Sequence, residues 1–113
     1  DAKSNAKLNN ITNTEFYLGD VSKVINKLKY VPDTIILDPP RSGISKDLID
    51  FLLSLKVKNI INISCNPLTL ARDINLLDSE YKLKSIKLVD EFPNTYHLES
   101  ITLLKLRKKA YNN

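Results

Sequence analysis

An apolar run that passes through a proline-marked turn into a helical pattern constrains this chain more than any other feature. Residues 60–63 read Ile-Ile-Asn-Ile, and Cys65 is followed by Asn66 and Pro67. Apolar residues then recur at helical spacing: Leu68, Ala71, Ile74 and Leu77. Asn favours the position just before a helix, and Pro favours the first helical position. The pattern therefore predicts a strand that ends near Cys65 and a helix over residues 67–79.

The other segments alternate between strand and helix patterns in the same way. Further strands are expected at 15–18, 34–37, 82–89 and 100–106; helices are expected at 1–9 (the tail of one), at 21–28 and after a cap at Ser45. The apolar run 34–37 is typical of a parallel strand that is buried on both faces. Strands that alternate with helices predict an α/β sheet with right-handed crossovers, and the last strand is expected to run antiparallel.

In such a sheet, ligands bind outside the carboxyl ends of the parallel strands. The loop Asp-Pro-Pro-Arg-Ser-Gly at 38–43 and the turn that begins at Ser64 both follow parallel strands. If the strand at 82–89 is also parallel, the polar segment 90–99 reaches the same edge. The sequence thus predicts a site built from three loops.

Cys65 is the candidate nucleophile of this site. A helix N-terminus favours negative charge, and the thiolate is the reactive form of cysteine. The alternative is that a lone cysteine serves as a small buried hydrophobic residue.

Three further side chains are candidates. Asp38 lies in a loop stiffened by two prolines, where its carboxylate can position a planar base or a cofactor amine, or only cap the next turn. Glu99 and His97 precede the last strand and could equally be surface residues. A carboxylate opposite a cysteine is nevertheless the pair needed when a thiolate adds to a ring and a proton must later leave.

Composition narrows the class of protein. The 113 residues are 42% hydrophobic and 27% charged, which is typical of one soluble globular domain. A net charge of +4 is consistent with a polyanionic partner, and no apolar stretch approaches a membrane span. One cysteine excludes an internal disulfide, so a cytoplasmic location is expected. Gly19 and Gly43 are the only glycines, so the chain holds no G-x-G-x-x-G loop.

Three motifs together carry a family resemblance. They are Asp-Pro-Pro-Arg at 38–41, Ser-Cys-Asn-Pro-Leu-Thr-Leu-Ala-Arg-Asp at 64–73 and Phe-Pro-Asn-Thr-Tyr-His-Leu-Glu-Ser at 92–100. In order and spacing they resemble the last three motifs of the RNA (uracil-5-)-methyltransferases, which act on tRNA and 23S rRNA with S-adenosylmethionine. The similarity runs over essentially the whole chain.

The resemblance implies a Rossmann-like class I methyltransferase sheet with strand order 3-2-1-4-5-7-6. Residues 1–113 would be the C-terminal part of that catalytic domain, without strands 1 and 2. The strand near 15–18 would then lack its usual neighbour, so we expect residues 1–30 to be less securely placed or to self-associate there. The isolated segment is expected to be inactive and to bind the cofactor weakly or not at all.

The resemblance also implies roles. Cys65 would add to C6 of a uracil, and Glu99 would remove the C5 proton. Asp38 would contact the cofactor or orient the target base, and Asp20 would hold the adenine ring of the cofactor. Supporting roles fall to the remaining motif residues Arg41, Asn66, Pro67 and His97.

Other activities remain open at this point. Methyltransferases that act on base amines resemble the chain in their D-P-P motif, but they carry an aromatic residue where Arg41 stands. Cytosine-5 RNA methyltransferases use two cysteines, and this chain has only Cys65. A basic α/β module that binds RNA without catalysis is the alternative from another class. We expect a uridine in RNA, rRNA in preference to tRNA, as the substrate. No metal-ligating residues are predicted in this sequence; because one cysteine cannot hold an iron–sulfur cluster, the presence of a cluster upstream stays open.

Overall fold

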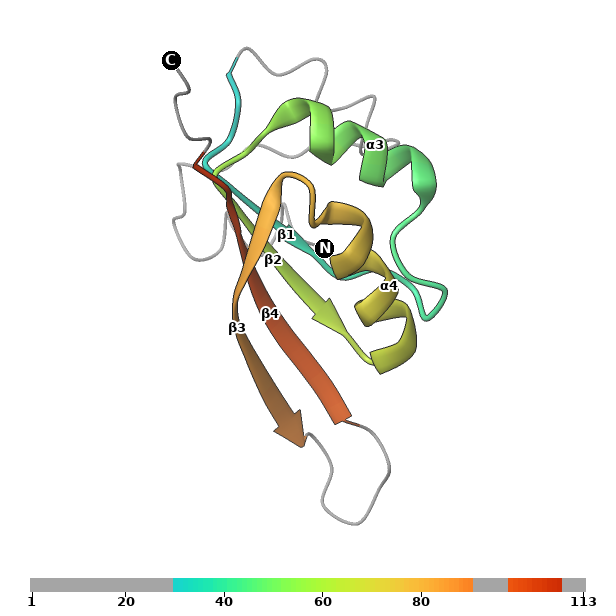
Figure 1. Cartoon of the computed structure of the whole chain (residues 1–113). Coiled ribbons are helices and arrows are strands. Elements are labelled where there is room, and N and C mark those ends of the chain that lie inside the picture. The colour runs from blue at the N-terminus through green and yellow to red at the C-terminus, as the bar shows by residue number, and fades with distance from the viewer. Residues whose placement is uncertain (1–29, 91–97, 109–113) are drawn as a thin grey trace, which may run out of the picture.

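The computed structural model describes residues 30–90 and 98–108 of the chain, which form a four-stranded sheet and two helices (Figure 1). The elements are β1 (Thr34–Leu37), α3 (Lys46–Leu55), β2 (Asn59–Ser64), α4 (Pro67–Leu77), β3 (Tyr81–Asp90) and β4 (Leu98–Leu106). The helices and strand predicted within residues 1–28, and the self-association predicted near 15–18, lie outside the described residues.

The strand order in the sheet is β1-β2-β4-β3. β1 and β2 are parallel, and β4 runs antiparallel to both β2 and β3. This is the 4-5-7-6 portion of the expected strand order, and the antiparallel last strand is confirmed. β3 therefore points in the same direction as β2, so β1, β2 and β3 all end at one edge of the sheet.

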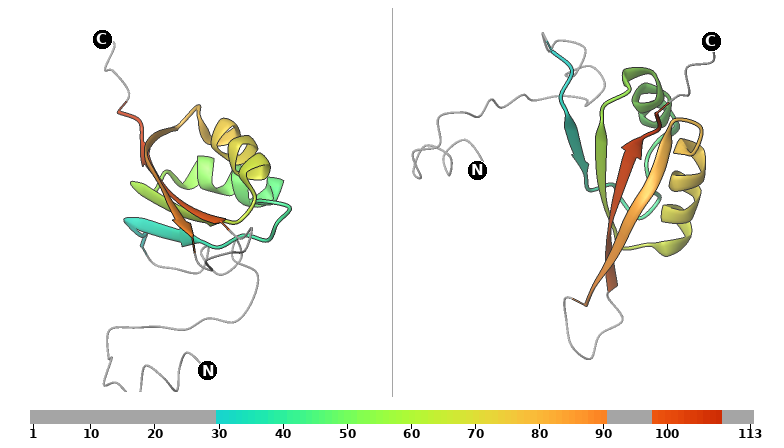
Figure 2. Two further views of the ribbon diagram at one scale, coloured as in Figure 1. Left: turned by 90° about the horizontal axis from the view of Figure 1, so that it is seen from below. Right: turned by 60° about the vertical axis from the view of Figure 1, so that its left-hand side comes forward.

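Both helices lie on the same face of the sheet (Figure 2). The connections from β1 to β2 and from β2 to β3 both move along the sheet in the same direction. Because such crossovers are right-handed, the helix of each connection lies on the same face. The predicted cap of α3 is confirmed, because Ser45 Oγ accepts a hydrogen bond from the Leu48 amide at 3.2 Å. α3 ends at Lys56, whose left-handed backbone (φ 57°) lets its amide bond to the Leu52 carbonyl.

The hydrophobic core fills the space between this face and the helices. Its buried members are Leu37, Ile44, Ile49, Leu52, Val57, Ile60, Leu77, Tyr81 and Leu104. Tyr81 is the first residue of β3 and lies at the end of the core opposite the carboxyl ends of β1, β2 and β3. Its hydroxyl donates to the Val57 carbonyl at 2.8 Å. Burial, more than the nearby Glu80 charge, raises the pKa of Tyr81 to about 12.

The expectation that residues 34–37 are buried on both faces is wrong in the described part of the chain. Leu37 is buried against the helices, but Ile36 is 66% exposed. Successive strand residues point to opposite faces, and α3 and α4 cover only one of them.

The buried face of α4 also differs from the expected one. Leu70, Asp73 and Leu77 are buried, whereas Leu68 is 82% exposed. A count of apolar residues did not identify this buried face, because the residue at the centre of the face, Asp73, is charged. The helix also ends at Leu77, two residues earlier than predicted, and the strands 81–90 and 98–106 begin or end one to two residues beyond their predicted bounds.

Candidate active site

Two of the three predicted loops begin at the edge where β1, β2 and β3 end, and most of the third segment, 90–99, lies outside the described residues. Asp38 directly follows β1, and Cys65 directly follows β2. β4 begins at the same edge, so Glu99, its second residue, lies there too. The structure thus brings these three predicted site residues to one end of the sheet.

Cys65 and Glu99 flank the end of the β2–β4 ladder. Its last pair is Ser64 with Ser100, and Cys65 directly follows Ser64 while Glu99 directly precedes Ser100. Ser100 Oγ also donates to the Ser64 carbonyl at 3.3 Å, which holds the two strands together at this point.

Alternation along β4 fixes the face on which this pair lies. Ser64 and Ser100 are buried on the helix-covered face. Glu99 precedes Ser100 in the strand and therefore projects to the opposite face. Cys65 is exposed, so its thiol is accessible to a substrate, and the reading of Cys65 as a buried hydrophobic residue is wrong.

The turn that carries Cys65 is fixed on both sides. Ser64 Oγ accepts from the Asn66 amide at 3.1 Å and donates to the Asn66 carbonyl at 3.1 Å. Asn66 is the N-cap of α4, where its Oδ1 accepts from the Leu68 amide at 3.1 Å, and Pro67 begins the helix. Asn66 and Pro67 thus turn the chain from strand into helix directly after Cys65, and their supporting roles in the reaction stay predictions.

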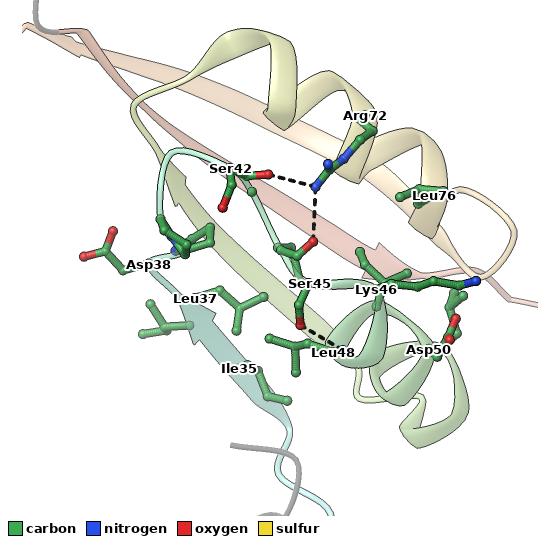
Figure 3. Close-up of a pocket in the computed structure, with 17 residues that line it drawn as sticks. Ile35, Leu37, Asp38, Ser42, Ser45, Lys46, Leu48, Asp50, Arg72 and Leu76 are labelled. Carbon is green, nitrogen blue, oxygen red and sulfur yellow. Dashed lines mark hydrogen bonds between the residues drawn. The ribbon is translucent and has the colours of Figure 1, made fainter. Parts of the chain in front are cut away.

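The loop at 38–44 is held by side chains of α4. Arg72 Nη2 donates to the Ser42 and Ile44 carbonyls, each at 3.1 Å (Figure 3). Asp73 Oδ2 accepts from the Ile44 amide at 2.9 Å. Sequence reasoning assigned neither residue a role; the signal that was available is a charged residue, Asp73, between Leu70 and Leu77 on one helix face.

An open cavity of about 870 Å³ lies beside this loop, between β1 and α3. Its walls include Ile35 and Leu37 of β1 and Leu48 of α3, and Asp38 lies at its border. The volume is within the range of small-molecule pockets. Neither Cys65 nor Glu99 lines it, so the cavity and the Cys65–Glu99 pair are neighbouring but separate features joined by the loop.

Asp38 and Arg41 present different groups to this region. Among the described residues, the Asp38 carboxylate has no hydrogen-bond or ion-pair partner, and in Figure 3 it points away from α3. Arg41 has an exposed side chain, and its carbonyl accepts from Asn66 Nδ2 at 3.0 Å and from Thr69 Oγ1 at 3.1 Å. Two other predicted site residues, Asp20 and His97, lie outside the described residues.

Two searches of the described residues are negative. No group of three or more His, Cys, Asp or Glu side chains within 30–90 and 98–108 is arranged to hold a metal ion. No helix in this part of the chain is both long and apolar enough to cross a membrane.

Comparison with known proteins decides the family. Residues 3–107 match the family model described as tRNA (uracil-5-)-methyltransferase. The chain belongs to this family. RNA methyltransferases of Bacteroides thetaiotaomicron and Clostridium acetobutylicum are 46% and 47% identical to it, over 95% and 92% of the chain. The chain spans only 24% and 23% of the lengths of these two relatives.

A solved structure shows the same fold. The Pyrococcus abyssi tRNA (uracil-54, C5)-methyltransferase, in complex with S-adenosyl-L-homocysteine, superposes with a TM-score of 0.76 at 36% identity. The match covers 91% of this chain and 25% of that one. The expected assignment to the C-terminal part of a methyltransferase sheet is therefore confirmed.

Proposed function

We propose that the protein, in its full natural length, methylates C5 of a uridine in RNA through a covalent bond between Cys65 and the base. The observation that carries the proposal is that Cys65 and Glu99 flank the last pair of the β2–β4 ladder, Ser64 with Ser100, at one edge of the sheet. Family membership supports the reaction class, because the family model is named for uracil-5 methylation.

The chemistry needs a nucleophile and a base on the same side of the ring. The Cys65 thiolate adds to C6, and the C5=C6 electron pair shifts toward C5 and O4, which makes C5 nucleophilic. S-adenosylmethionine, when bound, supplies an electrophilic methyl group. The Glu99 carboxylate then takes the proton from C5, the double bond reforms and the thiolate leaves C6. The net change exchanges one C5 proton for a methyl group and regenerates Cys65.

The target uracil must leave its stack to reach Cys65, as bases do for other enzymes that modify them. Cys65 is exposed directly after the end of β2, where its thiol is open to the approach of a base. Arg41, whose side chain is exposed at the same edge, would support the binding of this base or of its phosphates.

The described residues fit the expected cofactor in charge. S-adenosylmethionine carries a sulfonium and an ammonium, and Asp38 offers a carboxylate without a partner among the described residues. The cavity beside Asp38 has the size and the apolar walls of a small-molecule pocket. Asp20, which the resemblance assigns to the adenine ring, lies outside the described residues. The complex of the Pyrococcus abyssi relative with S-adenosyl-L-homocysteine supports S-adenosylmethionine as the cofactor.

The class of RNA and the activity of the segment belong to the same proposal. The preference for rRNA over tRNA stays a prediction, and the names of the family model and of the solved relative refer to tRNA. Residues 1–113 alone should be inactive, because their two glycines cannot form a glycine-rich cofactor loop.

The test is an adduct trap with the full-length protein, S-adenosylmethionine and RNA that contains 5-fluorouridine. Fluorine at C5 cannot leave as a proton, so the reaction should stall as a complex that survives denaturing electrophoresis. Cys65→Ala should abolish the complex, while Arg107→Gln, which removes an exposed ion pair away from this edge, should retain it. Running rRNA and tRNA transcripts in parallel identifies the substrate. Methyl transfer without an adduct would indicate a base amine as the target, and no transfer to either RNA would favour an RNA-binding module.

A further inference from the structure

We propose that three residues of α4, Thr69, Arg72 and Asp73, are positioning residues that fix the loop 38–44 relative to Cys65. We call these three residues the α4 clamp. The inference rests on the proposed function, because the groups that the clamp positions are Asp38 and Cys65. No catalytic contact is assigned to the clamp residues themselves.

The clamp supplies hydrogen bonds that the loop does not make for itself. Within the loop, one backbone bond is present, from the Gly43 amide to the Pro40 carbonyl at 2.8 Å. Pro39 and Pro40 have no amide hydrogen to donate. The carbonyls of Ser42 and Ile44 are instead satisfied by Arg72 Nη2. Residues 42–44 of the loop are therefore held in position by a side chain of α4.

Asp73 anchors the clamp from inside the protein. It accepts from the Ile44 amide at 2.9 Å through Oδ2 and from Arg72 Nη2 at 2.8 Å through Oδ1. Its side chain is 2% exposed, whereas that of Arg72 is 50% exposed. A buried carboxylate with one fixed set of donors allows few alternative arrangements, so the position of Ile44 is tightly defined.

Thr69 joins the near half of the loop to the Cys65 turn. Its Oγ1 lies 3.1 Å from the Arg41 carbonyl and 3.2 Å from the Asn66 carbonyl, so its single proton is shared between, or alternates between, the two segments. Asn66 Nδ2 donates to the same Arg41 carbonyl at 3.0 Å. Asn66 directly follows Cys65, so the loop that begins at Asp38 is connected to the nucleophile by two hydrogen bonds to one atom.

One rigid element thus sets both halves of the site. α4 begins at the Cys65 turn, and its first two turns hold the loop that begins at Asp38. A misplacement of about 1 Å in a catalytic arrangement can cost about 10²-fold in rate. Loosening the clamp should therefore slow the reaction without removing any reacting group.

The test is the single-turnover rate of adduct formation with 5-fluorouridine RNA in the full-length protein. Thr69→Val removes the hydroxyl and keeps the shape, and Arg72→Lys keeps the charge but not the two-carbonyl contact. Each should lower the rate by about 10-fold or more, and Thr69→Ser should restore most of it. Arg107→Gln removes an equally short Arg–Asp pair outside the loop, and its rate should equal that of the wild type.

The end point of the same reaction separates positioning from folding. A positioning role leaves the final fraction of trapped enzyme unchanged and lowers only the rate. A rate equal to wild type in Thr69→Val and Arg72→Lys, or a lowered end point at an unchanged rate, would overturn the inference.

Hydrogen exchange distinguishes failure of the inference from failure of the proposed function. Peptides that cover 38–45 should exchange faster in Arg72→Lys than in wild type, while peptides of β2 should not change. If wild type forms no adduct, the proposed function is wrong; unchanged exchange at 38–45 would by itself show that the clamp does not hold the loop.

Discussion

Two Arg–Asp pairs on α4 are of nearly equal length but of different consequence. In the middle of the helix, Arg72 Nη2 lies 2.8 Å from Asp73; just after its end, Arg107 Nη2 lies 2.7 Å from Asp78. The side chain of Asp73 is 2% exposed, whereas that of Asp78 is 64% exposed. Distance alone therefore does not rank the two pairs.

What differs is the environment and the further contacts of each arginine. Arg72 also holds two loop carbonyls, and Asp73 also receives a backbone amide, so the pair is part of a connected network. Within the described residues, the side chain of Arg107 bonds to Asp78 alone, through one side-chain and one backbone oxygen. The comparison indicates that buried polar groups hold the candidate site in place. The region around Asp78 and Arg107 has only a solvent-exposed ion pair.

Replacing Asp73 should give the largest effect. Asp73→Leu leaves the Ile44 amide and the Arg72 guanidinium without their acceptor, which should cost about 3 kcal/mol of local stability. Hydrogen exchange of the peptides at 38–45 and 67–77 measures this loss, and Asp78→Leu is the matched control. Similar exchange in the two variants would show that the two pairs are equivalent.

Gly43→Ala should disturb the same network from the side of the loop. Gly43 has φ +89°, and a Cβ there would lie 2.6 Å from Arg72 Nη2 and 2.8 Å from Asp73 Oδ2. Left-handed backbone strain and the displaced side chains together should cost about 2 kcal/mol. Thermal unfolding compares this variant with Ser42→Ala, whose side chain takes no part; equal midpoints would contradict the crowding at Gly43.

Tyr81→Phe tests the opposite end of the core. Loss of the hydrogen bond to the Val57 carbonyl should cost about 1 kcal/mol near neutral pH. The pKa of Tyr81 is raised from 10 to about 12, so the folded state holds this proton more tightly than the unfolded state does. Its stabilising contribution is complete below pH 10 and is lost as the pH rises from 10 toward 12. Urea unfolding at pH 8 and pH 11 should therefore show a smaller difference between wild type and Tyr81→Phe at pH 11, and a constant difference would refute the assignment.

Arg107→Gln should have the smallest effect. Exposed ion pairs contribute about 0–1 kcal/mol, and salt screens them further. The thermal midpoint of the variant should lie close to that of wild type at both low and high salt. A drop in the thermal midpoint as large as that caused by Asp73→Leu would remove the distinction between the buried and the exposed Arg–Asp pair.

Much of the described fold follows from local patterns in the sequence. The caps at Ser45 and Asn66, with Pro67 at the first helical position, are determined by residues adjacent in the chain, and these predictions are confirmed. The strand order followed from the family resemblance rather than from any single segment. The burial of residues 34–37 was predicted wrongly because coverage of a face depends on what packs there, which one strand pattern does not contain.

The candidate site was predicted in part. The placement of Asp38, Cys65 and Glu99 at one edge follows from strand direction, and the structure places them there. The α4 clamp was missed, because its bonds to the loop join residues 28 to 30 positions apart and most of their acceptors are backbone carbonyls. Periodicity counts apolar residues, so it could not recognise Asp73 as the centre of a buried face.

The most direct test of the Cys65–Glu99 pair uses Glu99→Gln with unmodified RNA and S-adenosylmethionine. The amide cannot take the C5 proton, so turnover should fall by about 10²–10⁴-fold. The methylated base should then remain bound to Cys65 as a complex that survives denaturation, and Cys65→Ala in the same variant should abolish it. Turnover at the wild-type rate, or loss of turnover without any trapped complex, would contradict the proposed roles of these two residues.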